Sequence, residues 1–229
     1  MFEAKRSYRG GVTAPHHLAA ESGLEILRSV GNAVEAMGAA AATIAVVYPH
    51  MNAIGGDGFW LIHPAGADKP IAIDACGRAA SHASAAFFAA HGEDRIPSRG
   101  PRAAITVPGA ISGWEQALRV SADIGGSVPL PSLLENAIHH AETGVPATGS
   151  QVRLTLEKFA ELKDQPGYGS VFLDDGVPPS PGQKITQPAL AATLRRLGTV
   201  GLDDFYHGSL AERIAKELEA VGSPLSSDC

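Results

Sequence analysis

Two helices are predicted by the spacing of apolar residues in the first 50 positions. From residue 18 to residue 30, Ala20, Leu24 and Leu27 recur with the i, i+4, i+7 spacing that places side chains on one face of a helix. A short strand is expected before this helix. The Gly-Asn dipeptide at 31–32 is typical of a helix end.

The second helix is predicted over residues 33–47, where apolar residues occupy nearly every position. Asn32 can cap its first turn, and Glu35 stands where a capping box has its acid. A helix that is apolar on all sides must be covered on all sides. Its many alanines allow close backbone approach, so we expect it to lie flat against a sheet or another helix, and to end at Pro49.

A β-hairpin is predicted next. Residues 58–63 and 70–75 contain β-prone runs, and their connection, 64–69, has turn-forming residues throughout. Strands then become rare. Gly- and Pro-rich connections separate five helical patterns, at about 109–121, 131–143, 148–163, 187–198 and 209–221. The stretch 167–187 has no lasting periodicity, which predicts a surface loop, either ordered or mobile.

The last helical pattern has well-marked ends. Ser209 and Glu212 have the spacing of a capping box, and Gly222 followed by Pro224 ends the pattern. These elements predict an α+β chain, in which an N-terminal α/β part is followed by a mainly helical region. We expect a single domain over residues 1–229.

Composition narrows the classes of function. The chain has 229 residues, of which 45% are hydrophobic and 18% charged, so it can bury a core. Its net charge of -6 and the lack of a basic run argue against a nucleic-acid partner. The longest apolar stretch, 36–47, is shorter than the roughly 18 residues of a membrane span. Two cysteines fit a reducing compartment, and no apolar signal segment follows residues 1–11, so the cytoplasm is the expected location.

A glycine-rich loop is the densest candidate for a functional segment. Gly55, Gly56 and Gly58 lie between a predicted helix and a predicted strand, where glycines permit positive φ and close backbone approach. The order helix, loop, strand is the reverse of a phosphate-binding loop, so we expect no helix N-terminus to face these glycines. A crowded turn under a sheet is the structural interpretation, and a small-molecule site is the alternative.

Arg78 is the second candidate. It follows the predicted strand that ends at residues 74–75, and its neighbours are small, which leaves room for a ligand. A guanidinium presents a fork of donors that suits a carboxylate. The structural alternative is an arginine paired with Asp74 or another acid.

The histidines and cysteines are weaker candidates for functional residues. The adjacent histidines at 16–17 and 139–140 should point to different sides of an element, and no metal-binding spacing is present, so we expect no metal ion and no other cofactor. The scattered histidines are expected at the surface: His63, His82, His91 and His207. Arg78 could lower the pKa of the nearby Cys76 thiol, but small apolar neighbours favour an inert buried cysteine. Cys229 is only the last residue, and no GxSxG elbow is present.

Several segments occur in an order and spacing that match a known family. They are GVTAPHHLA at 11–19, GNAVEA at 31–36, PHMNAIGGDGFWLI at 49–62 and DACGRA at 74–79, followed by 107–114, 134–146, 187–190 and 205–211. Over nearly its whole length, the chain resembles the N-terminal part of the large subunit in the gamma-glutamyltranspeptidase family. The PHMN and GGDGFWLI segments resemble the branch with oxamate amidohydrolase and related acylases more than the glutathione-cleaving enzymes.

The resemblance implies an N-terminal-nucleophile hydrolase, an αββα sandwich made as one precursor that cuts itself into a large and a small subunit. It implies that the threonine opening the small subunit attacks an amide carbonyl while its own α-amino group serves as the base. The acyl-enzyme then passes to water or to an acceptor amine. By the same resemblance, Arg78 matches the large-subunit arginine that binds the substrate α-carboxylate.

One family feature is missing from the sequence. The self-cleavage segment, an Asp/Thr-Thr-His-like stretch, does not occur in these 229 residues. We therefore expect an incomplete sandwich that supplies Arg78 but is inactive alone, as a truncation, a frameshift or a split gene would leave it. The expected partners are a small amide or gamma-glutamyl substrate and the small-subunit remainder of the precursor, and we expect an oligomer. The alternative is a truncated pseudoenzyme that serves as a non-catalytic interaction subunit.

Overall fold

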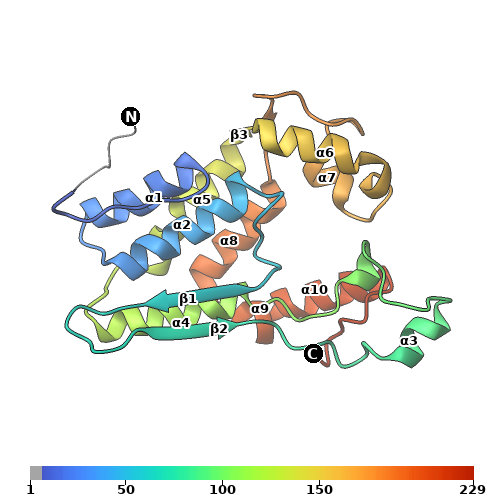
Figure 1. The fold of residues 1–229 in the computed structure, drawn as a ribbon, viewed down its shortest axis with the longest axis horizontal. Coiled ribbons are helices and arrows are strands. Elements are labelled where there is room, and N and C mark those ends of the chain that lie inside the picture. The colour runs from blue at the N-terminus through green and yellow to red at the C-terminus, as the bar shows by residue number, and fades with distance from the viewer. Residues whose placement is uncertain (1–6) are drawn as a thin grey trace.

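The structure, a computed structural model, describes residues 7–229, and about half of them are helical (Figure 1). The helices are α1 (His17–Arg28), α2 (Ala33–Val47), α3 (Ala85–Ala90), α4 (Ala110–Asp123), α5 (Leu130–Thr143), α6 (Gly149–Leu162), α7 (Tyr168–Phe172), α8 (Pro188–Val200), α9 (Asp204–His207) and α10 (Ser209–Ala220), with a 3-10 turn at Pro101–Ala103. The strands are β1 (Gly58–Ile62), β2 (Ile71–Ala75), β3 (Val145–Pro146) and β4 (Lys184–Ile185). Within the described residues, no helix has both the length and the apolar character needed to cross a bilayer.

Helix α2 lies at the centre of a helical layer formed by α1, α2, α5 and α8. It packs mainly against α1, α4 and α5, and the hairpin contacts it at Val34, beside Ile62. The predicted capping box is confirmed: Asn32 Oδ1 accepts the Glu35 N–H at 3.0 Å, and Glu35 Oε2 accepts the Asn32 N–H at 2.8 Å. The all-round apolar pattern of this segment is thus explained by neighbours on several sides.

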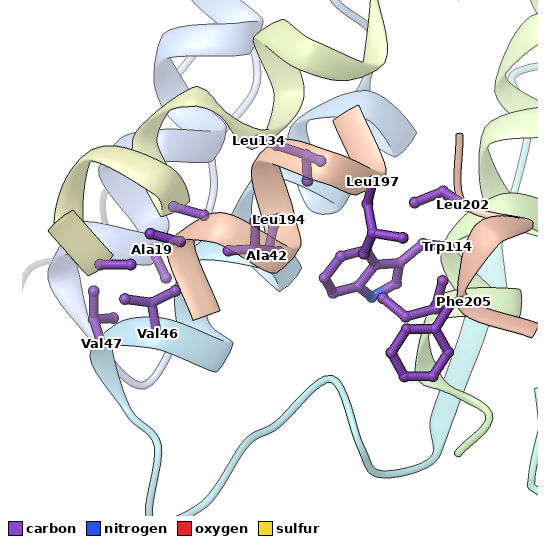
Figure 2. Packing of buried hydrophobic residues seen from close by; sticks show 14 of the residues in the cluster. Ala19, Ala42, Val46, Val47, Trp114, Leu134, Leu194, Leu197, Leu202 and Phe205 are labelled. Carbon is purple, nitrogen blue, oxygen red and sulfur yellow. The ribbon is translucent and has the colours of Figure 1, made fainter. Parts of the chain in front are cut away.

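The hydrophobic core joins this layer to the rest of the molecule. Leu134, Leu194 and Leu197 are fully buried between α5 and α8. Figure 2 shows Trp114 of α4 beside Leu197 and Phe205, so the same core continues from the helical layer to α4 and α9. The short helix α9 is therefore anchored in the core by its second residue.

The predicted hairpin is confirmed. Strands β1 and β2 pair antiparallel, with Trp60 opposite Ile73, and one face of the pair packs on α4. Gly113 of α4 makes room for this packing, because a Cβ there would lie 2.9 Å from the Ala75 Cβ. The other face is open: Phe59 and Leu61 are 71% and 75% exposed.

Three expectations about local structure are wrong. No strand precedes α1 in the described residues 7–16. The stretch 167–187 contains α7 and β4, and β4 pairs with β3. The capping box expected at Ser209 does not form, because Gly208 is the N-cap of α10 and Ser209 lies inside the helix.

Candidate functional site

Three segments that are distant in sequence meet at the end of β2: residues 55–58, 76–80 and 105–110. The Asp57 carboxylate accepts the Gly77 N–H at 3.0 Å. On the other side, the Val107 N–H donates to the Arg78 carbonyl at 2.9 Å, and the Ala80 N–H donates to the Ile105 carbonyl at 2.8 Å. The backbone on both sides of Arg78 is therefore fixed by hydrogen bonds to another segment.

Two glycines allow these segments to touch through their backbones. A Cβ on Gly77 would lie 1.6 Å from the Val107 carbonyl oxygen, and one on Gly109 would lie 1.9 Å from the Ala75 carbonyl oxygen. Neither space can hold a methyl group, so a side chain at either position would push the segments apart.

The glycine-rich loop at 55–58 contributes to this junction of the three segments in a way that its sequence did not indicate. A helix N-terminus does face it: the N–H groups of Gly109 and Ala110, where α4 begins, donate to the Gly56 carbonyl at 3.0 and 2.8 Å. These donors are satisfied by protein backbone. None of the three glycines in the loop has positive φ. The geometry supports the structural interpretation, a turn that links the hairpin to α4.

Arg78 lies on the wall of a cavity of about 900 Å³. The other walls come from residues 107–115 at the start of α4, from 203–208 around α9, from 211–218 on α10, and from the tail at 225–229. Among residues 7–229, no acidic side chain lies within ion-pairing distance of the Arg78 guanidinium. The structural alternative, a pair with Asp74, is therefore not what the structure contains.

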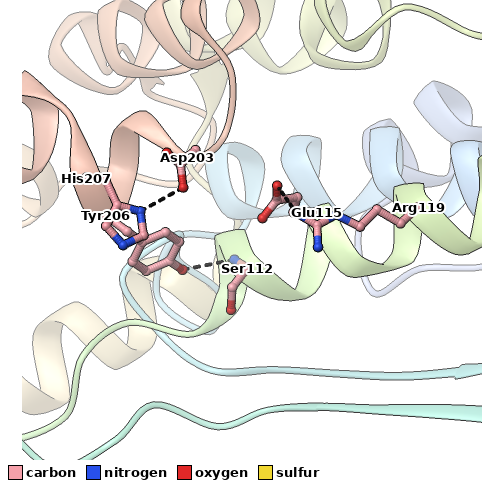
Figure 3. A network of polar contacts seen from close by, with 6 residues as sticks. All are labelled: Ser112, Glu115, Arg119, Asp203, Tyr206 and His207. Carbon is pink, nitrogen blue, oxygen red and sulfur yellow. Dashed lines mark hydrogen bonds and ion pairs between the residues drawn. The ribbon is translucent and has the colours of Figure 1, made fainter.

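The charges around the cavity are unequal. Arg78 is the only arginine or lysine among the described residues that line it, whereas four acids do so: Glu115, Asp203, Glu212 and Asp228. Two of these acids are paired, as Figure 3 shows: Glu115 bonds Arg119 at 2.8 Å, and Asp203 bonds the ring of His207 at 2.7 Å. A ligand carboxylate thus has one cationic partner here, and a ligand ammonium group has acidic ones.

Helix α9 brings a tyrosine to the start of α4. The Tyr206 hydroxyl donates to the Pro108 carbonyl at 2.8 Å and accepts the Ser112 N–H at 2.9 Å, the second of these drawn in Figure 3. Burial raises the pKa of this phenol above its ordinary value, which keeps it protonated as a donor. Tyr206 belongs to the family-like segment 205–211, but nothing in the sequence indicates that its hydroxyl reaches residues near 110.

The histidines and cysteines differ in part from expectation. His16 and His17 do not point to different sides: their rings stack at 4.7 Å, because His16 is the N-cap and lies outside the helix. His63, His82, His91 and His207 are exposed, as predicted. In the described part of the chain, no three His, Cys, Asp or Glu side chains are grouped so as to hold a metal ion.

Cys76 is exposed, so the prediction of a buried cysteine is wrong. The charge that acts on its thiol is Asp57, whose carboxylate lies 3.8 Å from the sulfur, and not Arg78. The negative charge of Asp57 raises the pKa of Cys76, which disfavours the reactive thiolate.

Comparison with known proteins shows which family this chain resembles. The family model described as gamma-glutamyltranspeptidase matches residues 19–228. The oxamate amidohydrolase proenzyme of Klebsiella pneumoniae is 53% identical over 99% of this chain and 42% of its own length. A glutathione hydrolase-like proenzyme of Bacillus subtilis is 35% identical over 95% of this chain and 40% of its own length. The chain thus spans about two-fifths of the length of these relatives.

Solved structures show the same likeness. The gamma-glutamyltranspeptidase of Helicobacter pylori superposes with a TM-score of 0.88 at 29% identity, over 99% of this chain and 64% of that one. The enzyme of Pseudomonas nitroreducens, in complex with L-DON, gives 0.84 at 32% identity, over 97% of this chain and 64% of that one. These matches confirm the predicted α+β class and the N-terminal-nucleophile hydrolase fold.

Proposed function

Since this chain belongs to the gamma-glutamyltranspeptidase family, we propose that it forms the carboxylate-binding side of an amide-hydrolysing site and that Arg78 binds the carboxylate. The observation that supports this role is an arginine without an acidic partner among residues 7–229, on the wall of a cavity of about 900 Å³. Its fork of donors can bind both oxygens of a carboxylate, which fixes the orientation of the substrate as well as its position.

The reaction uses a threonine that these 229 residues do not supply, because no Thr-Thr-His-like segment occurs among them. The hydroxyl of that threonine attacks the amide carbonyl carbon, and its proton passes through the α-amino group to the leaving nitrogen. The C–N bond breaks, which leaves an ester on the threonine. Water or an acceptor amine then attacks this ester and restores the hydroxyl. Arg78 holds the carboxylate in both steps and exchanges no proton.

Two substrate classes fit the site in different ways. Sequence identity favours oxamate as the substrate, because the relative that is 53% identical is an oxamate amidohydrolase proenzyme. The acids Glu212 and Asp228 on the cavity wall favour a substrate that also carries an ammonium group, as a gamma-glutamyl compound does. We place oxamate first, because its carboxylate lies next to the amide carbonyl that reacts. A competition between oxamate and L-glutamate for the same site measures the preference.

The partner in this proposal is the rest of the precursor. Its support is the open face of the hairpin, where Phe59 and Leu61 are 71% and 75% exposed. Large apolar side chains at alternate positions of one strand form a surface that another sheet covers in a two-layer fold. The small-subunit segment of the precursor is the occupant that we propose for this face.

Calorimetric titration of the purified chain with oxamate tests the role of Arg78. Arg78→Ala should weaken binding strongly, because loss of a charged carboxylate clamp costs roughly 2–4 kcal/mol. Arg78→Lys should recover only part of it, since an ammonium group cannot bind both oxygens. Arg153→Ala removes an exposed arginine of α6 that pairs with Glu157, and it is the matched control. Equal affinities of wild type and Arg78→Ala for oxamate would contradict the binding role and leave Arg78 with a structural one.

A second experiment separates the enzyme from the interaction subunit. The complete gene product should release ammonia from oxamate, and Arg78→Ala should raise the KM more than it lowers the kcat. The 229-residue chain alone should give no turnover with oxamate or with gamma-glutamyl-p-nitroanilide. Turnover by the chain alone would contradict the external nucleophile, and a complete product without turnover would favour a non-catalytic interaction subunit.

A further inference from the structure

The hydroxyl of Tyr206 is inserted at the first turn of α4. Pro108 and Ser112 are four residues apart, so the carbonyl of the first and the N–H of the second are the two groups that pair in a regular helix. Here they are bridged by the Tyr206 hydroxyl, at 2.8 Å from the Pro108 oxygen and 2.9 Å from the Ser112 nitrogen. The hydroxyl therefore sets where α4 begins and how the Pro108 peptide is oriented.

The orientation of that peptide is passed on to Arg78 through one residue. Val107 precedes Pro108, and its N–H donates to the Arg78 carbonyl at 2.9 Å. The neighbouring pair, Ala79 and Thr106, forms an antiparallel bridge. A rotation of the peptide between Val107 and Pro108 would break this short ladder. The Val107 carbonyl has no room to move toward Gly77, because its oxygen would lie only 1.6 Å from a Cβ at that glycine.

Tyr206 is itself held through the two residues that precede it in α9. Phe205 is 7% exposed and packs in the core, with its ring 5.2 Å from the Tyr206 ring. The Asp204 carboxylate binds the Arg196 guanidinium of α8 at 2.5 and 2.9 Å. The arginine first, and then the N–H groups that follow in α10, hold the pKa of Asp204 below its ordinary value, so this pair stays charged.

We infer that Tyr206 is the positioning residue for Arg78: its hydroxyl keeps the Pro108 carbonyl and the Ser112 N–H apart and thereby holds the 105–107 segment against the 78–80 segment. This inference rests on the proposed function, in which Arg78 binds the substrate carboxylate. It assigns Tyr206 no contact with the substrate and no part in proton transfer. Through Tyr206, the packing of α9 on the helical layer fixes the orientation of the Arg78 guanidinium.

Tyr206→Phe in the full chain tests the inference by residue-resolved amide hydrogen exchange and by oxamate titration. Without the hydroxyl, the Ser112 N–H can pair directly with the Pro108 carbonyl, so the Ser112 amide should keep its protection. The Val107 and Ala80 amides should exchange faster, because their partners at Arg78 and Ile105 move away. Binding of oxamate should weaken roughly threefold to tenfold, the range expected from one hydrogen bond.

Tyr168→Phe is the matched control, since Tyr168 lies on α7 and does not line the cavity. It should change neither the exchange pattern nor the affinity for oxamate. Faster exchange of the Val107 and Ala80 amides, together with weaker binding of oxamate, supports the inference. Unchanged exchange, or faster exchange with unchanged affinity, overturns it while the effect of Arg78→Ala leaves the proposed function intact. If Arg78→Ala also fails to weaken binding, the proposed function and this inference fail together.

Discussion

The helical layer and the cavity are stabilised by different means. In the layer of α1, α2, α5 and α8, contact is made between apolar side chains, and Leu194 and Leu197 are completely buried. Around the cavity, contact is made between backbones, at Gly77 and Gly109, and through single hydrogen bonds such as the one from Tyr206 to Pro108.

This difference determines how each region responds to change. A layer of many dispersion contacts loses stability in proportion to the atoms removed, and it does so over the whole domain. A junction of backbones loses its geometry when a single atom is added, with a smaller loss of total stability. Stability is thus concentrated in the layer, and orientation of Arg78 depends on the junction.

The largest expected effect on stability is in the layer. Leu194→Ala should lower the free energy of unfolding by about 3–5 kcal/mol, because it removes a fully buried side chain and leaves a cavity in the layer. Urea unfolding measures this loss. Leu156→Ala on α6, where the leucine is 60% exposed, is the control and should have little effect. Similar losses for both variants would contradict the assignment of the core.

The next effect tests the junction. Gly77→Ala should lower the free energy of unfolding by only about 1–3 kcal/mol, yet it should abolish oxamate binding, because the added Cβ displaces the Val107 segment from Arg78. Gly55→Ala adds a Cβ in open space and should change neither quantity. A Gly77→Ala variant that binds oxamate normally would remove the contrast between the two regions.

The smallest effect concerns pH. Burial, followed by the charges of His17 and other neighbours, lowers the pKa of His16 below 6.5. The unfolded chain then binds this proton more readily than the folded chain does, so the free energy of unfolding falls as the pH drops through and below 6.5. Burial also lowers the pKa of His50 and His140, which act in the same direction.

His16→Asn separates this titration from the cap that His16 provides. Its side chain accepts the Leu18 N–H at 3.3 Å, and an asparagine oxygen can do the same. The variant should match wild type at about pH 7.5 and lose less stability at about pH 5.5, in urea unfolding at both values. His82→Asn, at an exposed position, is the control. An identical pH dependence for His16→Asn and wild type would exclude His16 as a source of acid lability.

Local patterns predicted those elements whose stabilising contacts lie within a few residues. The capping box of Asn32 and Glu35, the hairpin and the long helices all depend on contacts or periodicity inside one segment. The capping box expected at Ser209 does not form, because α10 has Gly208 as its N-cap and no side chain caps it. A Cβ on Gly208 would lie 2.0 Å from an Asp204 carboxylate oxygen, so close packing against α9 requires a glycine at this cap.

By itself, the sequence determined the long helices, the hairpin, the family and the position of Arg78 after a strand, because periodicity and short motifs carry that information. Only the tertiary structure decided that Gly77 and Gly109 bring two backbones into contact, and that the Tyr206 hydroxyl lies between Pro108 and Ser112. The partners in these contacts are separated by about 30 to 100 positions, and no local pattern relates residues that meet only when the core has formed.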